Sequence, residues 1–418
     1  MKKILLLLSC LCIVLTLTAQ QNSGDCGVGG RYLNKIFTPA AATTVIYGHN
    51  VTISGAQKDL KMDIYQPAGD ARTDRPVLVI AFGGSFIGGA RTDATMVNIC
   101  KAWAARGYVT ASIDYRLYDG ALFPIPDSTK FANVVVKAVA DFKAAVRFLR
   151  MTAATGNPYG IDPSKIIVGG ESAGSIVAMH TTYLRTLSEA PAFIQQYVIS
   201  NGGIHGNTDL PGNSTMAYSD STMGMVNYYG GLYRKELLNA GEPPIISIHG
   251  TADNVVPYNY GYATVFGQNI ITLNGSGRCN PRATAVGVTN QLISVPNGGH
   301  GGFSAAFTDS METSAVLFMY NNVVCPLAVA TQNARPLTTF SLQPNPATAA
   351  FTVRIADMPS AYTLELYDAF GRTVRSLHSH SPELTVAREA LPTGAYFVRI
   401  RFDDAAQRLP ITQKVVFE

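Results

Sequence analysis

The sequence predicts two folded parts, an α/β part with a mostly parallel sheet and a small C-terminal β-sandwich. Strands and helices alternate from about residue 60, whereas short strands with strict two-residue alternation follow from residue 340. The 418-residue chain is 47% apolar and only 14% charged, where about 25% charged is ordinary for a soluble protein. A composition this apolar excludes an intrinsically disordered chain.

Buried strands and amphipathic helices follow one another in the first part. The predicted strands are 60–64, 77–82, 108–114, 165–168, 245–248 and 292–295. The predicted helices are 94–106, 131–151 and one that begins at Ala173. Residues 77–82 are a continuous apolar run, which is typical of a strand buried on both faces. Alternation of this kind indicates a parallel sheet covered by helices on both sides.

Residues 187–240 interrupt this rhythm and are rich in Gly, Asn, Ser, Tyr and Met. Ligands bind at the carboxyl ends of the strands in open α/β folds. We therefore expect an insertion that forms a lid or part of a substrate pocket. The alternative is that residues 187–240 form an ordinary surface segment with no role in binding.

The first twenty residues are expected to be a signal peptide, cleaved near Ala19. Lys2 and Lys3 precede an apolar stretch of 14 residues, 4–17, which is shorter than the roughly 20 residues that span a bilayer. An N-terminal membrane anchor is the alternative. Since no later segment approaches spanning length, we expect no integral membrane segment after cleavage.

Cleavage would leave Cys26, Cys100, Cys279 and Cys325. In an exported protein these four form up to two disulfides, with three possible connectivities. No two of them have the close spacing of metal ligands. The net charge of +4 includes the two N-terminal lysines, and basic residues form no run. We therefore expect no nucleic-acid binding.

The C-terminal part of the sequence has a different pattern of apolar and polar residues from the first part. Residues 328–339 are expected to be a linker, which makes 21–327 one large domain and 340–418 a second. Residues 351–355, 362–366 and 396–402 alternate apolar and polar side chains. Short alternating strands separated by Gly and Pro turns predict a β-sandwich.

The candidate nucleophile is Ser172, in the sequence Gly170-Glu171-Ser172-Ala173-Gly174. This G-x-S-x-G motif follows an apolar strand and precedes a helix, which is the setting of a nucleophile elbow. Such a turn strains the serine backbone, so its neighbours must be small. A plain Gly-rich turn is the alternative.

A serine hydroxyl needs a base, and the base needs an orienting acid. His300 lies among glycines in 297–302, directly after the last predicted strand. In the chain order Ser, Asp, His the acid precedes it. Residues 254–299 contain no Asp or Glu, so we expect Asp253 to be this acid. Four other acids between Ser172 and His300 lie in or beside the expected insertion and are poorer candidates: Asp209, Asp220, Glu236 and Glu242.

An acyl-transfer site also requires donors for a developing oxyanion. The segment 82–86 follows the first buried strand, where lipases and esterases carry an HGGG-type loop. We expect the backbone N–H groups of Gly84, Ser85 and Ala173 to form the oxyanion hole. A tight turn is the other interpretation of this segment, and it does not exclude the role.

With these motifs, residues 45–325 resemble the α/β-hydrolase carboxylesterases, particularly secreted bacterial lipase- or esterase-like enzymes. Residues 114–117 and 159–163 match further segments of that family. The resemblance implies an α/β-hydrolase fold and ester hydrolysis through an acyl-enzyme, without metal or organic cofactor. It assigns Ser172 as nucleophile, His300 as general base and acid, and Asp253 as orienting acid.

The expected substrates are short-chain esters or acetyl and feruloyl esters linked to polysaccharide, and lipids are a further possibility. A serine peptidase of the same fold and a noncatalytic surface-binding protein are the competing functions.

Residues 340–418 resemble the sorting domain of the type IX secretion system of Bacteroidetes. The matching segments are 343–346, 366–372 and 391–396. The resemblance implies passage through the type IX machinery and release or attachment at the cell surface. A carbohydrate-binding or adhesive sandwich is the alternative.

Overall fold

The computed structural model describes residues 28–123, 125–303, 305–326, 340–355, 358, 360–368, 373–403 and 411–418. The chain divides into two compact units, Met1–Leu327 and Ala328–Glu418. The expected signal peptide 1–20 and linker 328–339 lie outside the described residues.

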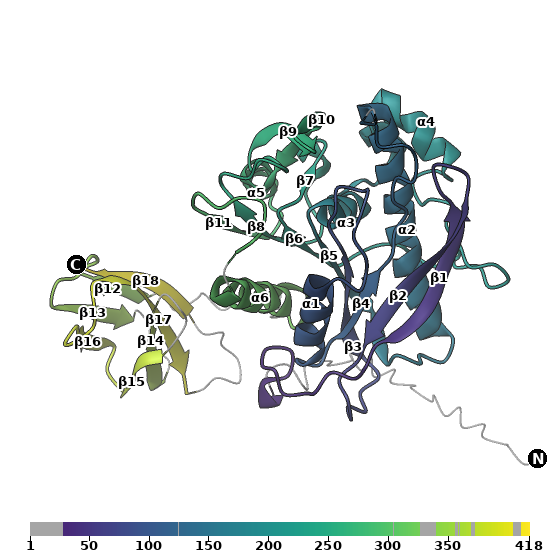
Figure 1. Ribbon diagram of the computed structural model, residues 1–418. Coiled ribbons are helices and arrows are strands. Elements are labelled where there is room, and N and C mark those ends of the chain that lie inside the picture. The colour runs from purple at the N-terminus through teal and green to yellow at the C-terminus, as the bar shows by residue number, and fades with distance from the viewer. Residues whose placement is uncertain are drawn as a thin grey trace, which may run out of the picture. The chain divides into compact units, whose positions relative to one another are not determined.

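An eight-stranded sheet forms the centre of the first unit (Figure 1). Its strands are β1 (Thr43–Val51), β2 (Gln57–Tyr65), β3 (Arg75–Ala81), β4 (Val109–Ile113), β5 (Ile161–Glu171), β6 (Gly224–Tyr228), β8 (Ile245–Gly250) and β11 (Asn290–Val295). They are ordered β1-β2-β4-β3-β5-β6-β8-β11. The pairs β1–β2 and β2–β4 are antiparallel, and the other pairs are parallel. The predicted mostly parallel sheet is therefore confirmed.

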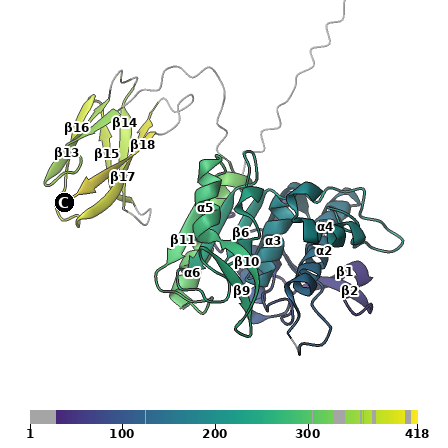
Figure 2. The same cartoon turned by 90° about the horizontal axis from the view of Figure 1, so that it is seen from above.

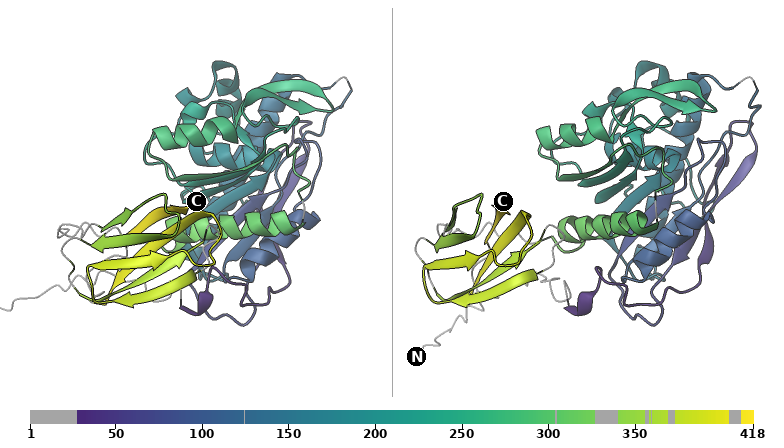
Figure 3. Two further views of the ribbon diagram at one scale, coloured as in Figure 1. Left: turned by 90° about the vertical axis from the view of Figure 1, so that its left-hand side faces the viewer. Right: turned by 60° about the vertical axis from the view of Figure 1, so that its left-hand side comes forward.

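Helices cover both faces of this sheet, with α1 and α6 on one side and α2 and α3 on the other (Figures 1 and 3). The helices are α1 (Ala94–Ala104), α2 (Ser128–Ala154), α3 (Ala173–Tyr183), α4 (Ala192–Ser200), α5 (Ser276–Ala285) and α6 (Ala305–Met319). Short helical turns are η1 (Val28–Gly30), η2 (Leu187–Glu189), η3 (Lys235–Leu237) and η4 (Tyr320–Val324). Within the described residues, none of these helices has the length and apolarity that a bilayer span requires.

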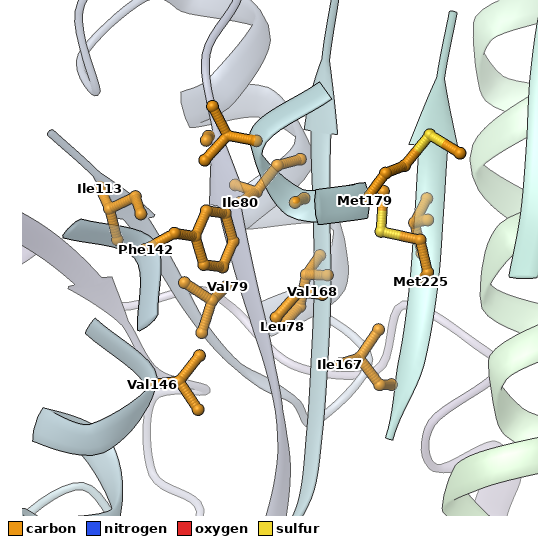
Figure 4. Close-up of a cluster of buried hydrophobic side chains, with 14 of the residues drawn as sticks. Leu78, Val79, Ile80, Ile113, Phe142, Val146, Ile167, Val168, Met179 and Met225 are labelled. Carbon is orange, nitrogen blue, oxygen red and sulfur yellow. The ribbon is translucent and has the colours of Figure 1, made fainter. Parts of the chain in front are cut away.

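The core lies between the sheet and its helices. All seven residues of β3 are buried, as expected for a parallel strand covered on both faces. Phe142 and Val146 of α2 pack near Val79 of β3, and Met179 of α3 lies beside Met225 of β6 (Figure 4). Burying each such side chain contributes about 1.5–3 kcal/mol. This packing fixes the sheet edge on which the candidate site is built.

The segment expected to be an insertion differs from the prediction, because it contains the sheet strand β6. The sequence pattern does not predict this strand, because it has only five residues and includes Gly224 and Asn227. The tertiary contacts of these two residues explain why each is suited to a buried strand. A Cβ at Gly224 would lie 2.6 Å from Sδ of Met319, and the buried Asn227 amide donates to the hydroxyls of Ser247 and Ser276.

A second, three-stranded sheet has the order β7-β10-β9, and Figure 2 shows its strands β9 and β10 side by side. Its strands are β7 (Gly231–Leu232), β9 (Tyr260–Val265) and β10 (Gln268–Gly275). The strands β9 and β10 form an antiparallel hairpin between β8 and α5 in the chain.

Long cations of α2 hold the segment 201–208 against the body of the domain. Nζ of Lys143 donates to the carbonyl of Ile204 at 2.6 Å, and Arg147 donates to the carbonyls of His205 and Thr208. Both side chains are buried. Burial lowers the pKa of Lys143 to about 8, because a charged amine loses solvation there.

This burial predicts a pH-dependent stability that Lys143→Met removes. Between pH 8 and the ordinary lysine pKa of about 10.4, the unfolded chain binds more protons than the folded chain. The free energy of unfolding then rises with pH, by about 2–3 kcal/mol in total. Denaturant unfolding at pH 7 to 10 should therefore show the free energy of unfolding of the wild type rising relative to that of Lys143→Met. Parallel curves for the two proteins would contradict the assignment.

The described cysteines do not form the two disulfides that the sequence allows. Cys100 and Cys279 are free, buried thiols, and burial raises the pKa of each to about 12. Cys325 is disulfide-bonded, and its partner lies outside the described residues.

The second unit is a pair of antiparallel sheets with one apolar core. The sheets have the orders β12-β13-β16 and β15-β14-β17-β18. The strands are β12 (Phe340–Gln343), β13 (Ala350–Ile355), β14 (Tyr362–Tyr367), β15 (Thr373–Ser379), β16 (Glu383–Ala387), β17 (Gly394–Phe402) and β18 (Ile411–Phe417). Phe351, Leu364 and Val398 are fully buried between them. The predicted β-sandwich is confirmed.

Candidate active site

Ser172 occupies a strained turn between β5 and α3. Its φ of 53° and ψ of −117° are rarely adopted by a residue with a side chain. The turn requires small neighbours, as the sequence analysis expected. A Cβ at Gly174 would lie 2.1 Å from the carbonyl oxygen of Ala81 at the end of β3. The N-terminus of α3 can therefore approach the sheet edge only with glycine at that position.

The structure brings Ser172, His300 and Asp253 together at the carboxyl ends of β5, β11 and β8. Nε2 of His300 lies 2.7 Å from Oγ of Ser172, and Nδ1 lies 2.7 Å from Oδ2 of Asp253. Because Oδ2 is an acceptor, Nδ1 carries a hydrogen and donates it. In the neutral imidazole Nε2 is then free to accept the hydroxyl proton of Ser172. The arrangement has the connectivity of a serine-hydrolase triad.

The side chain of Asp253 is completely buried, and each of its two carboxylate oxygens has a hydrogen-bond partner. Oδ1 accepts the amides of Val255 and Val256 at 2.8 and 3.0 Å. Burial alone would raise the pKa of Asp253, but hydrogen bonds from His249 and His300 outweigh it and hold this pKa well below its usual range. The acid is therefore ionised and able to stabilise a positive imidazole.

A second buried histidine, His249, supports the acid from β8. Its Nε2 lies 3.2 Å from Oδ2 of Asp253 and 3.1 Å from the carbonyl oxygen of Val256. Both atoms are acceptors, so Nε2 carries a hydrogen. Nδ1 lies 2.9 Å from the hydroxyl of Ser276, which also accepts from the amide of Asn227. His249 lies four residues before Asp253 in the sequence, and no motif in the sequence selects it.

We predict that His249 positions Asp253, so His249→Leu should lower kcat about tenfold with little change in KM. Loss of a hydrogen bond to a charged group is worth about 1.5–3 kcal/mol, and part of this acts in the transition state. His249→Gln retains an N–H donor at similar reach and should recover most of the loss. A purely structural role would instead lower the melting temperature of both variants while leaving kcat of the folded fraction unchanged.

Tyr229 is a further residue that sequence reasoning missed. It follows β6 with a φ of 42°, and its ring packs edge-on against the imidazole of His300, with centroids 5.0 Å apart. Its hydroxyl donates to the carboxylate of Glu171, the residue before the nucleophile. Burial and the Glu171 carboxylate raise the pKa of Tyr229 well above its usual range. No sequence pattern indicates a positive φ at a tyrosine.

The predicted oxyanion residues come from the turn after β3 and from the start of α3. Three consecutive residues after β3 have positive φ: Gly84 (113°), Ser85 (54°) and Phe86 (62°). Within the part of the chain that the structure describes, no acceptor is bonded to the amides of Gly84 or Ser85. Ala173 is the first residue of α3, and its amide is one of the orphan donors of a helix N-terminus. Ser85, Ser172 and Ala173 line the same pocket.

That pocket is lined mostly by apolar side chains. It lies between α2 and α3 on one side and α4 and the β9–β10 hairpin on the other. Its volume is about 120 Å³. Residues 189–206, from the segment expected to be a lid, supply part of its wall.

The mostly parallel sheet with helices on both faces has the α/β-hydrolase fold. Residues 62–202 match the BD-FAE family model, which describes α/β-hydrolase esterases. Residues 341–418 match the secretion system C-terminal sorting domain, Por_Secre_tail. The chain therefore carries an esterase-family domain followed by a type IX sorting domain. This domain indicates export to the cell surface or outside the cell.

Individual relatives are distant. A probable isoprenylcysteine alpha-carbonyl methylesterase of Oryza sativa subsp. japonica is 29% identical over 126 residues, 30% of this chain and 26% of the relative. A non-reducing polyketide synthase of Emericella nidulans is 27% identical over 202 residues, 45% of this chain and 8% of the synthase. The chain thus spans about a quarter or less of these curated relatives.

Among solved structures, a thermophilic esterase from Thermogutta terrifontis is 23% identical, with a TM-score of 0.46. The comparison covers 67% of this chain and 93% of that esterase.

Proposed function

We propose that this protein is a secreted serine hydrolase of carboxylic esters that acts through an acyl-enzyme. The observation that carries the proposal is the continuous chain of contacts from Ser172 through His300 to Asp253, with both hydrogen-bond distances at 2.7 Å. The BD-FAE match supports the ester as the bond cleaved. Short-chain esters and acetyl or feruloyl esters on polysaccharide, the substrates expected from the sequence, all share this bond.

The proposed reaction begins when His300 accepts the proton of the Ser172 hydroxyl at Nε2. Oγ then attacks the ester carbonyl carbon, and the amides of Gly84, Ser85 and Ala173 stabilise the oxyanion that forms. His300 gives its proton to the leaving alcohol oxygen as the ester bond breaks. Water, deprotonated by His300, then attacks the acyl carbonyl carbon. His300 returns this proton to Oγ of Ser172 as the acyl–oxygen bond breaks, which releases the carboxylic acid. Asp253 keeps the imidazole oriented and stabilises its charge in both halves.

The test compares the hydrolysis of an ester with that of an amide by the same mature protein. p-Nitrophenyl butyrate should be hydrolysed at least a hundredfold faster, in kcat/KM, than a proline-containing peptide p-nitroanilide. The first nitrophenol released should form a burst equal to the enzyme concentration if hydrolysis of the acyl-enzyme is the slower step. Preference for the peptide would support the serine peptidase instead, and failure to cleave either would support a binding protein.

A further inference from the structure

We propose that the apolar pocket beside Ser172 binds the acyl group, and that this group is an unbranched aliphatic chain considerably longer than acetyl. The inference rests on the proposed esterase function and specifies its substrate class. Three features of the described residues carry it, namely the direction of the pocket, the pairing of polar groups in its wall and its position relative to His300.

The pocket follows one side of α3 away from the nucleophile. Ala173, Ile176, His180 and Leu184 all line it, at the spacing of a single helix face. At a rise of about 1.5 Å per residue, these positions extend roughly 16 Å beyond the start of the helix. An acetyl group would occupy only the first part of this length.

The polar wall residue that faces the pocket from the middle of α3, His180, already has its partners within the protein. Nδ1 of His180 lies 2.8 Å from the carbonyl oxygen of Ile176, and Nε2 accepts the amide of Tyr233 at 3.2 Å. Burial also lowers the pKa of His180, which favours the neutral ring. Because neither nitrogen is left over, this buried histidine offers no hydrogen bond to a ligand.

Two further wall residues also have partners within the protein. One oxygen of Glu189, Oε2, accepts the amides of Arg185 and Thr186. The hydroxyl of Thr264 donates to the carbonyl of Asn254. A feruloyl ring would bring a phenolic hydroxyl and a methoxy group into a pocket lined mostly by apolar side chains, where burying a polar group without a partner is unfavourable. An alkyl chain carries no such groups.

The position of His300 distinguishes the acyl side from the alcohol side. In the proposed reaction Nε2 of His300 must reach the leaving oxygen, so the alcohol lies beside that imidazole. Ser85, Ser172 and Ala173 line the apolar pocket, whereas His300 is not among its described lining residues. The pocket is therefore on the side of the carbonyl carbon that bears the acyl chain.

The comparison of acyl groups uses one leaving group throughout. We expect kcat/KM for p-nitrophenyl esters to rise by about fourfold per added methylene and to be on the order of a hundredfold higher for octanoate than for butyrate. Methyl octanoate should also be hydrolysed faster than methyl ferulate. If acetate is the best substrate and rates fall with chain length, the inference is overturned while the serine esterase stands. If no ester is hydrolysed and Ser172 is unreactive, the proposed function itself fails.

A pair of variants in α4 tests the location of the chain. Ile194 lines the pocket and is only partly exposed, whereas Ile199 is 61% exposed on the same helix. Ile194→Trp should lower the octanoate-to-acetate ratio of kcat/KM at least tenfold, and Ile199→Trp should leave this ratio unchanged. If Ile194→Trp does not fold, Leu184→Trp, at the far end of α3, should lower the ratio for laurate over acetate. Unchanged ratios in folded pocket variants would overturn the proposal.

Discussion

Replacing Ser172 by alanine is expected to lower kcat for p-nitrophenyl butyrate by at least about 10⁵-fold, because the nucleophile that forms the acyl-enzyme is lost. Removal of the serine from comparable triads costs about 10⁶. What remains is the contribution of oxyanion donors and substrate binding, about 10³–10⁴ over water. The measurement is steady-state hydrolysis by purified wild type and variant at equal concentration of folded protein.

Ser172→Ala should not destabilise the fold, since alanine keeps the same Cβ at the φ of 53°, and loss of one hydrogen bond is a small effect. Ser200→Ala, on the exposed end of α4, is the matched control and should retain full activity. Retention of more than about one hundredth of the activity in a contamination-free Ser172→Ala sample would place the chemistry elsewhere in the molecule.

The second large effect is expected for Asp253→Asn, which should lower kcat about 10⁴-fold with an intact fold. The amide preserves the size of the side chain, and its oxygen still accepts the amides of Val255 and Val256. However, the neutral group no longer stabilises a charged imidazole. Its NH₂ also favours the wrong tautomer of His300, with hydrogen on the nitrogen that must accept the serine proton. The readout is kcat together with a thermal melt.

A carboxylate–histidine pair outside the site provides the control for this substitution. Asp59 lies 2.6 Å from Nδ1 of His49 on the β1–β2 edge, and Asp59→Asn should leave kcat within about twofold. Since His249 and His300 hold the pKa of Asp253 well below its usual range, acidification to pH 5 should not protonate this acid. Equal activity losses in the two Asn variants would argue against a specific role for Asp253.

The sequence was sufficient to predict the fold class and to select the three triad candidates. Buried parallel strands have a distinctive apolar run, as in 77–82. The triad candidates each follow a strand, and their order along the chain, Ser, Asp, His, can be read directly from the sequence. The contact of His249 with Asp253 could not be predicted in the same way, because a buried histidine at a strand end has no characteristic neighbours in sequence.

Other features depend on tertiary context that the sequence pattern does not contain. Gly224 and Asn227 read as loop residues, yet Met319 and two buried hydroxyls make them suitable for β6. The apolar pocket combines residues from α2, α3, α4 and the β9–β10 hairpin. Each of these elements supplies only a few apolar side chains. Their joint cavity therefore exists only in the folded chain, and the sequence pattern alone does not specify the acyl group.

The most direct test of the central claim is covalent labelling with a fluorophosphonate, followed by peptide mass spectrometry. Phosphonylation requires a serine activated by its base, and it requires no knowledge of the substrate. We predict one adduct, on the peptide that contains Ser172, and a rate of labelling that falls at least a hundredfold in His300→Ala. Absence of an adduct in the folded wild type, or an adduct on another serine, would contradict the account.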